Sequence, residues 1–329
     1  MTETERYHCA YIGRQNSHCP CLVEKRGQFC YWHDPDVSKE GPEVKAKLEA
    51  WAKMGYSMEG FCLRRADLSD IHLEAKVNGA GMDLSHADLY HANLKDAHLF
   101  EINLSYANLI KADFTRANLH WASLKRANLL GTNFLHAKLE HIEWGKRILQ
   151  EVEASRMRSK GLHQDAKSLF IESEEIYRSL FRECEKQGLY EEAGNFFRKE
   201  MLMRRAQMPK LSFKWLVSCL VDISCGYGER PWRVVAFCSL VILGCACLYY
   251  FFGIQGQGQI LQFSLDKGLW TALKEWTLCV YFSVVTFTTL GFGDYTPVGI
   301  SRIIAAMEAL AGAFIMALFV VVFVKKMTR

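Results

Sequence analysis

Residues 288–294 read Thr-Thr-Leu-Gly-Phe-Gly-Asp, and this heptad lies between two long apolar segments. Residues 234–254 contain no charged side chain, and residues 303–324 contain one, Glu308. As helices that rise about 1.5 Å per residue, both segments are long enough to cross a hydrocarbon core of roughly 30 Å. We therefore expect two transmembrane helices in a multidomain membrane protein.

The stretch before the heptad, Trp276–Thr288, is apolar but too short to cross a bilayer, which is typical of a re-entrant segment. Irregular backbone at membrane depth must be buried in protein or line a wet cavity. A short helix ending at the heptad would aim the negative end of its dipole at that cavity and favour a cation there. Glycines at 291 and 293 permit the left-handed backbone that turns successive carbonyls the same way. The heptad is therefore predicted to line a cation pore.

The charges that flank the two apolar segments predict their orientation. Arg230 and Arg233 precede the first segment, and Lys325, Lys326 and Arg329 follow the second. Basic side chains in the intervening region are balanced by acidic ones. The positive-inside rule then places both termini in the cytoplasm. We expect a multi-pass protein of the plasma membrane, and specifically of a bacterial inner membrane.

Residues 231–326 resemble a two-helix potassium channel, with an outer helix, a re-entrant pore helix, a filter and an inner helix. The commonest filter text in that family is Thr-Val-Gly-Tyr-Gly-Asp, and residues 289–294 read Thr-Leu-Gly-Phe-Gly-Asp. The resemblance implies K⁺ as the transported ion and no enzymatic activity. It also implies a homotetramer, because each chain supplies one filter loop. The filter residues carried over are Thr288, Thr289, Leu290, Gly291, Phe292, Gly293 and Asp294.

Two residues depart from the family pattern. Phe292 lacks the tyrosine hydroxyl, and Phe282 stands seven residues before Thr289, where many relatives have tryptophan. A hydrogen-bonded cuff around the filter is therefore expected to be absent, which leaves a weakly selective cation channel as an alternative. A membrane-anchored scaffold with a vestigial pore is a third interpretation.

The second apolar segment carries two further candidate residues. The resemblance implies that Gly312 is a gating hinge, and the alternative is that it only permits close helix packing. Glu308 is an intramembrane carboxylate, which is by default a candidate for function. It could face the pore or lie behind the filter, bonded to the pore helix, and we favour the second position.

An internal repeat of period five occupies residues 63–144, with one slip near Asn78-Gly79. This period fits neither a helix nor a flat strand, so a coil that turns a corner every five residues is needed to point each leucine inward. The text resembles pentapeptide repeats, which implies a right-handed square β-solenoid with four units per coil. Such a stack needs capped ends, and Trp144 is a candidate plug. The inward residues are Leu or Phe at 84, 89, 94, 99, 104, 109, 114, 119, 124, 129, 134 and 139.

The charge of the repeat bears on its partners. Residues 64–144 contain ten acidic and nine basic side chains, so we do not expect a mimic of DNA. The whole chain has a net charge of +4, too small to indicate a nucleic-acid partner. We expect the repeat to be a rigid spacer or a docking surface for a cytosolic protein or ligand.

Cysteine and histidine crowd the first forty residues, where few apolar side chains could form a core. Four sulfur or nitrogen ligands would hold Zn²⁺ and supply the folding energy directly. Ordinary reduced thiols are the alternative. The favoured ligands are Cys9, Cys21, Cys30 and His33, with Cys19 as a substitute for Cys21.

The remaining segments complete the expected domain organisation. Residues 172–187 and 189–207 are predicted to form two antiparallel helices, resembling a tetratricopeptide-like hairpin, with Gly188 as the cap between them. A juxtamembrane interfacial helix follows, and Lys210 and Lys214 could meet anionic headgroups. The expected domains are a metal-binding segment at 1–40, a helical linker at 41–62, the solenoid at 63–144, a helical connector at 145–208, the interfacial helix at 209–229 and the channel domain at 230–329.

Overall fold

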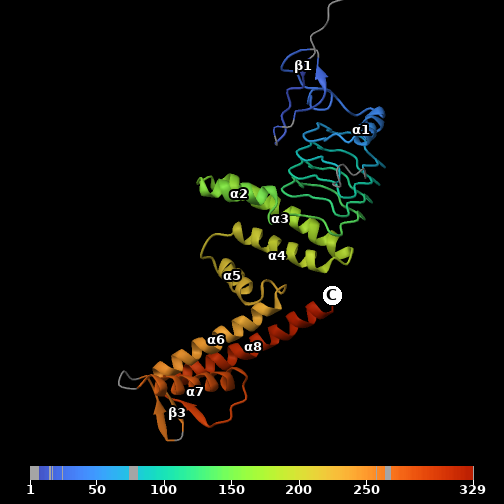
Figure 1. Cartoon of the computed structure of the whole chain (residues 1–329). Helices are drawn as coiled ribbons and strands as arrows, with labels where there is room; N and C mark the ends of the chain where they lie inside the picture. The colour runs from blue at the N-terminus through green and yellow to red at the C-terminus, as the bar shows by residue number, and fades with distance from the viewer. Residues whose placement is uncertain are drawn as a thin grey trace, which may run out of the picture. The chain divides into compact units, whose positions relative to one another are not determined.

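The computed structural model describes residues 7–14, 16, 18–23, 25–73, 81–256, 258–263 and 268–328. The chain divides into two compact units, Met1–Met208 and Pro209–Arg329. The first unit contains the repeat and helices α1 to α4, and the second contains the long apolar helices (Figure 1).

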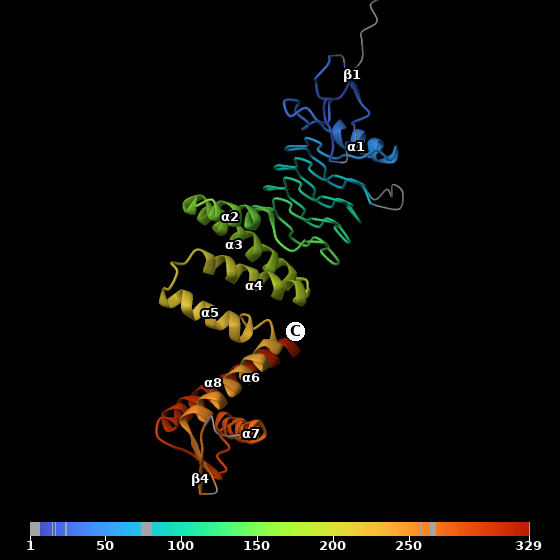
Figure 2. The same cartoon turned by 60° about the vertical axis from the view of Figure 1, so that its left-hand side comes forward.

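The repeat folds as a stack of coils, visible on edge in Figure 2. Parallel bridges join residues twenty positions apart, as in Asp83↔Asn103 and Ser123↔Glu143, so each coil contains four five-residue units, as predicted. Earlier bridges such as Cys62↔Asp88 span twenty-six residues. The predicted slip near Asn78-Gly79 lies outside the described residues. The right hand of the solenoid stays a prediction.

The solenoid core is built from the predicted inward residues. All twelve, from Leu84 to Leu139, are at most 5% exposed, and the alanines two positions before them are buried too. Two residues after each inward side chain the backbone is left-handed, with φ of 59° at His86 and 61° at Tyr106. This repeated corner explains the period of five, because the chain must turn once per unit to keep every leucine inside.

The two ends of the solenoid are covered within the same unit. A short hairpin, β1 (Tyr7–His8) with β2 (Leu22–Val23), and helix α1 (Glu43–Lys53) precede the first coil. Beyond the last coil, Trp144 lies edge-on to Phe134 and to Phe196, with ring centroids 6.0 and 5.4 Å apart. Trp144 therefore joins the last coil to the helices that follow.

Three helices follow the solenoid where the sequence predicted two: α2 (Leu149–Ser159), α3 (His163–Lys186) and α4 (Tyr190–Ala206). Helix α3, the longest of the three, begins nine residues before residue 172, where the first of the two predicted helices was expected to start. Gly188 is left-handed, with φ of 76°, and the next amide donates to the Cys184 carbonyl over 2.9 Å. Gly188 therefore caps the turn between α3 and α4, as predicted.

The second unit begins with α5 (Phe213–Cys225), which Ser212 caps by accepting a hydrogen bond from the Trp215 amide. Two helices in this unit are long and apolar enough to cross a membrane, α6 (Pro231–Phe252) and α8 (Ser301–Met327). They run side by side, and α7 (Leu269–Phe287) packs against both (Figure 1). Three short strands form an antiparallel sheet in the order β4-β3-β5: β3 (Ile254–Gly256), β4 (Gln259–Leu261) and β5 (Tyr295–Pro297).

Candidate pore loop and metal cluster

The predicted filter is the loop between α7 and β5. Thr288 still has helical φ, and left-handed φ then occurs at every second residue: 57° at Thr289, 60° at Gly291 and 79° at Gly293. Alternation of this kind can turn consecutive carbonyls towards one side, which an ion site made of backbone oxygens requires. Left-handed backbone is easy for glycine but costs about 1–2 kcal/mol for a residue such as threonine.

Contacts from α7 fix both ends of this loop. The amides of Thr289 and Leu290 donate to carbonyls in the last turn of α7, each over 3.0 Å. At the other end, the Tyr281 phenol lies within hydrogen-bonding reach of the Asp294 carboxylate, and its ring meets Tyr295 edge-on. Tyr281 is adjacent to Phe282 and was not predicted from the sequence as a contact of the loop. A tyrosine one residue away from the expected tryptophan position was the available signal.

Glu308 of α8 is only 2% exposed. Its carboxylate accepts a hydrogen bond from the Tyr249 hydroxyl of α6 over 2.6 Å and one from the Ser283 hydroxyl of α7 over 2.5 Å. Phe282 packs edge-on against the same tyrosine ring, with centroids 4.8 Å apart. A buried charge is tolerated only where hydrogen bonds replace its water. One carboxylate of α8 thereby links three helices, and its position behind the filter stays a prediction.

Gly312 is buried one turn further along α8. A Cβ at this position would lie 2.2 Å from the Phe287 carbonyl oxygen, at the end of α7. That distance is far inside van der Waals contact, so the glycine allows the two helices to approach closely. This geometry favours the packing interpretation, and the role of hinge stays a prediction.

Ion pairs join the start of α6 and the end of α8 to the segment before them. Arg233 donates to the Asp222 carboxylate over 3.1 Å and to its carbonyl over 2.8 Å. Lys325 donates to Glu229 over 2.5 Å. Helix α5 leaves large apolar side chains uncovered, with Phe213 80% exposed and Ile223 60% exposed. An exposed apolar face of this kind is typical of a helix at a membrane interface.

The N-terminal cluster brings four of the five candidate metal ligands together. One donor atom from each of Cys9, Cys19, Cys30 and His33 lies within 4.8 Å of the others, and all four residues are buried. The Cys30 sulfur lies 3.3 Å from His33 Nδ1 and 3.7 Å from the Cys19 sulfur. Cys21, one of the favoured four, is half-buried and outside this group.

Local backbone explains how these side chains converge. The hairpin places Cys9 beside Cys21, whose carbonyl accepts from the Cys9 amide over 2.9 Å. The chain then returns, and the Cys30 amide points at the Cys9 sulfur over 3.2 Å. His33 Nε2 lies 2.9 Å from the Glu59 carbonyl oxygen, which leaves Nδ1 facing the sulfurs. Hydrogen bonding from the Cys19 thiol, reinforced by His33, lowers the pKa of the Cys30 thiol, and a thiolate is the form that binds metal.

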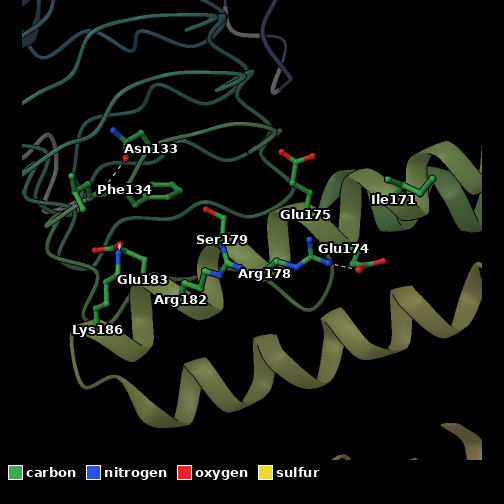
Figure 3. Close-up of a pocket in the computed structure, with 11 residues that line it drawn as sticks. Asn133, Phe134, Ile171, Glu174, Glu175, Arg178, Ser179, Arg182, Glu183 and Lys186 are labelled. Carbon is green, nitrogen blue, oxygen red and sulfur yellow. Dashed lines mark hydrogen bonds and ion pairs between the residues drawn. The ribbon is translucent and has the colours of Figure 1, made fainter. Parts of the chain in front are cut away.

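A groove of about 610 Å³ lies between the last coil and α3 (Figure 3). Asn133, Phe134 and Leu135 line one side, and side chains of α3 line the other. Arg178 is paired with Glu174 and with Glu200 of α4. The groove therefore carries largely compensated charges and forms part of the contact between α3 and the solenoid.

These features together define a class: a membrane protein with two long apolar helices, a short helix and glycine loop between them, and a coil of five-residue repeats. The family description "Ion channel" matches residues 236–329, and "Pentapeptide repeats" matches 62–105, 83–120 and 102–140. The chain belongs to the ion channel family and contains a pentapeptide-repeat region. Neither is a family of enzymes.

Two bacterial proteins are similar to part of this chain. Protein LctB of Bacillus caldotenax is 31% identical over 94 residues, which are 28% of this chain and 68% of that protein. Protein LctB of Geobacillus stearothermophilus is 33% identical over 92 residues, with the same two shares. Each alignment spans just over a quarter of this chain and about two thirds of the relative.

Two solved structures are similar to the repeat region. The pentapeptide repeat protein Rfr23 from the cyanobacterium Cyanothece 51142 is 34% identical, with a TM-score of 0.17, over 27% of this chain and 63% of that one. The pentapeptide repeat protein alr5209 from Nostoc Pcc 7120 is 35% identical, with a TM-score of 0.18, over 29% of this chain and 74% of that one. At these TM-scores the solenoid assignment rests on the coil geometry and the family match.

Proposed function

We propose that the chain is one subunit of a homotetrameric, K⁺-selective channel whose filter is formed by residues 288–294. One observation carries the proposal: left-handed backbone at Thr289, Gly291 and Gly293, immediately after a helix that ends at the loop. Alternate left-handed residues can present a row of carbonyl oxygens in place of an ion's water. The C-terminal end of α7 adds its negative dipole to the same place.

Tetramer formation is proposed from the number of loops and from the uncovered surface. One chain contributes a single loop, so a closed ring of carbonyls requires other copies. Leu290 and Phe292 of the loop are 62% and 66% exposed in a single chain, and Phe314 of α8 is 70% exposed. Apolar surface of this extent needs lipid or a neighbouring subunit to cover it.

The placement of the remaining parts follows from the same reasoning. We propose a plasma membrane location, as in a bacterial inner membrane, with both termini in the cytoplasm. Helix α5 would lie at the membrane interface, with Lys210 and Lys214 near anionic headgroups. The solenoid, proposed to be right-handed, and the helical connector would dock a cytosolic protein or ligand and pass its signal to the pore.

The N-terminal cluster is proposed to hold Zn²⁺. Three thiols and one imidazole suit this ion, which takes four sulfur or nitrogen ligands in structural sites. Because all four side chains are buried and their donor atoms already converge, the site is closed and structural rather than catalytic.

A weakly selective cation channel is the second candidate, favoured by Phe292, which has no hydroxyl to brace the filter. Purified protein in lipid vesicles separates the candidates by K⁺ and Na⁺ flux under opposed gradients. Gly291→Ala should abolish K⁺ flux while leaving the tetramer intact, because alanine opposes the left-handed backbone at that position. Gly244→Ala, in α6 with open space around its Cα, is the matched control and should conduct normally. A Gly291→Ala channel with normal K⁺ flux would refute the filter assignment.

A further inference from the structure

The first coil of the solenoid has an apolar end that must be covered to keep it from water. Its inward residues begin with Met58, Phe61 and Leu63, each at most 1% exposed. In a stack where each coil contacts only its neighbours, a terminal coil lacks one neighbour and needs a cap. Figures 1 and 2 agree that β1 and α1 lie at this end of the coils.

Helix α1 covers part of this end, with the Trp51 and Phe61 ring centroids 5.8 Å apart, and the metal-binding turn covers another part. Trp32, which lies between Cys30 and His33, accepts a hydrogen bond from the Cys62 amide over 2.8 Å. Its ring stacks on Phe61, with centroids 5.1 Å apart and planes 1° from parallel. His33 meets the same phenylalanine edge-on at 5.1 Å. The turn that supplies two donors to the cluster therefore also supplies part of the lid of the solenoid.

Regular secondary structure in this segment is short. Among the described residues of 7–40 it consists of one pair of two-residue strands and an isolated bridge between Ile12 and His18. The four donors come from separate stretches, around Cys9, Cys19 and Cys30–His33, so one ion would tie three stretches together. A few backbone hydrogen bonds, such as that from the Ala10 amide to the Gln28 carbonyl, also join these stretches, and metal–ligand bonds can add folding energy to a small domain.

A hollow of about 300 Å³ lies beside the cluster and is lined by Tyr11, His18, Cys19 and His33, among other residues. Tyr11 also stacks on the His33 ring, with centroids 3.9 Å apart. Two of the four donor residues therefore border a space from which a chelator can approach.

We propose that a metal ion bound by Cys9, Cys19, Cys30 and His33 holds the N-terminal cap on the solenoid. The bound ion would thereby protect the amides of the first coil from hydrogen exchange. The inference rests on the proposed zinc site, and it adds a consequence for residues 58–73 that contain none of the ligands. Middle coils, which have neighbours on both sides, should not depend on the ion.

The test uses the full chain in lipid nanodiscs. Metal content by mass spectrometry should give one Zn²⁺ per chain, and a chelator should remove it. Hydrogen exchange should then rise at least tenfold in peptides within 58–73 and stay constant within 102–124, and added Zn²⁺ should reverse the change. Absence of bound metal would refute the zinc site. If metal-free protein showed unchanged exchange in 58–73, the proposed role of the ion in holding the cap would be refuted, while the metal site would stand. An equal rise in both regions would refute a stabilising effect confined to the first coil.

Variants identify the ligands independently of the chelator. Cys30→Ser should lose the ion and reproduce the exchange pattern of the stripped protein, while Cys219→Ser, a half-buried thiol in α5, should behave as wild type. Cys19→Ser should lose the ion and Cys21→Ser should keep it. The reverse result for this last pair would overturn the four-donor assignment.

Discussion

The hydroxyl of Tyr249 should be worth a measurable part of the stability of the channel domain. It donates to the Glu308 carboxylate over 2.6 Å at a site where the tyrosine is fully buried. A hydrogen bond to a charged group contributes about 1.5–3 kcal/mol, so Tyr249→Phe should cost about 2 kcal/mol. For the unit Pro209–Arg329 the unfolding midpoint should fall by roughly 8 °C.

The chain provides a matched control at the next residue. The Tyr250 hydroxyl is also buried, but it has no hydrogen-bond partner among the described residues. Tyr250→Phe should therefore leave the midpoint unchanged or raise it slightly, because no bond is lost. Both variants can be compared with wild type by thermal unfolding in nanodiscs at one fixed scan rate.

A double-mutant cycle isolates the interaction itself. Glu308→Gln keeps the shape of the side chain but removes its charge, and combined with Tyr249→Phe it should give a coupling energy of about 1–2 kcal/mol. K⁺ flux should fall in the Glu308 variant, since the carboxylate also holds Ser283 of α7. Equal midpoint changes for Tyr249→Phe and Tyr250→Phe, or a coupling energy of zero, would contradict a stabilising hydrogen bond between Tyr249 and Glu308.

Three further perturbations test other parts of the account. Gly312→Ala should destabilise the channel by about 1–3 kcal/mol through overpacking against Phe287, and a normal midpoint with altered open time would instead favour the hinge. Tyr281→Phe should lower the K⁺/Na⁺ flux ratio with less effect on tetramer stability, because its phenol faces Asp294 at the end of the loop. Asp67 has a pKa held below its ordinary value, chiefly by hydrogen bonding from Ser69, so its contribution to solenoid stability is present above that ordinary value of about 4 and lost as the pH falls through the folded pKa. Asp67→Asn should weaken this acid sensitivity in a pH series of unfolding curves.

Periodicity allowed much of the first unit to be predicted from sequence. An apolar residue at every fifth position predicts an inward-facing side chain in each unit of a coil. The burial of Leu104 and Phe114 follows from this period. The left-handed corners did not follow, because residues such as Trp121 and Lys111 adopt them with no intrinsic preference for that conformation. The coil imposes the corner, and local propensity gives no sign of it.

Sequence reasoning was weaker where distant segments meet. Strands β3 and β5 are three residues each and pair across forty residues, so no pattern within either one indicates a sheet. The choice between Cys19 and Cys21 depends on the path of a hairpin, since side chains two residues apart differ only in their placement on it. Partners for Glu308 could be expected in advance, because a membrane-embedded carboxylate needs them, but its bond to Tyr249 of α6 required the structure.

The central claim is that residues 288–294 form a K⁺-selective filter, and the reversal potential under bi-ionic conditions tests it most directly. With purified protein in a planar bilayer, K⁺ on one side and Na⁺ on the other, the account predicts a large potential of the sign set by K⁺ permeation. A potential near zero with measurable current would show that the pore does not distinguish the ions. Absence of current under either ion would contradict conduction by this loop.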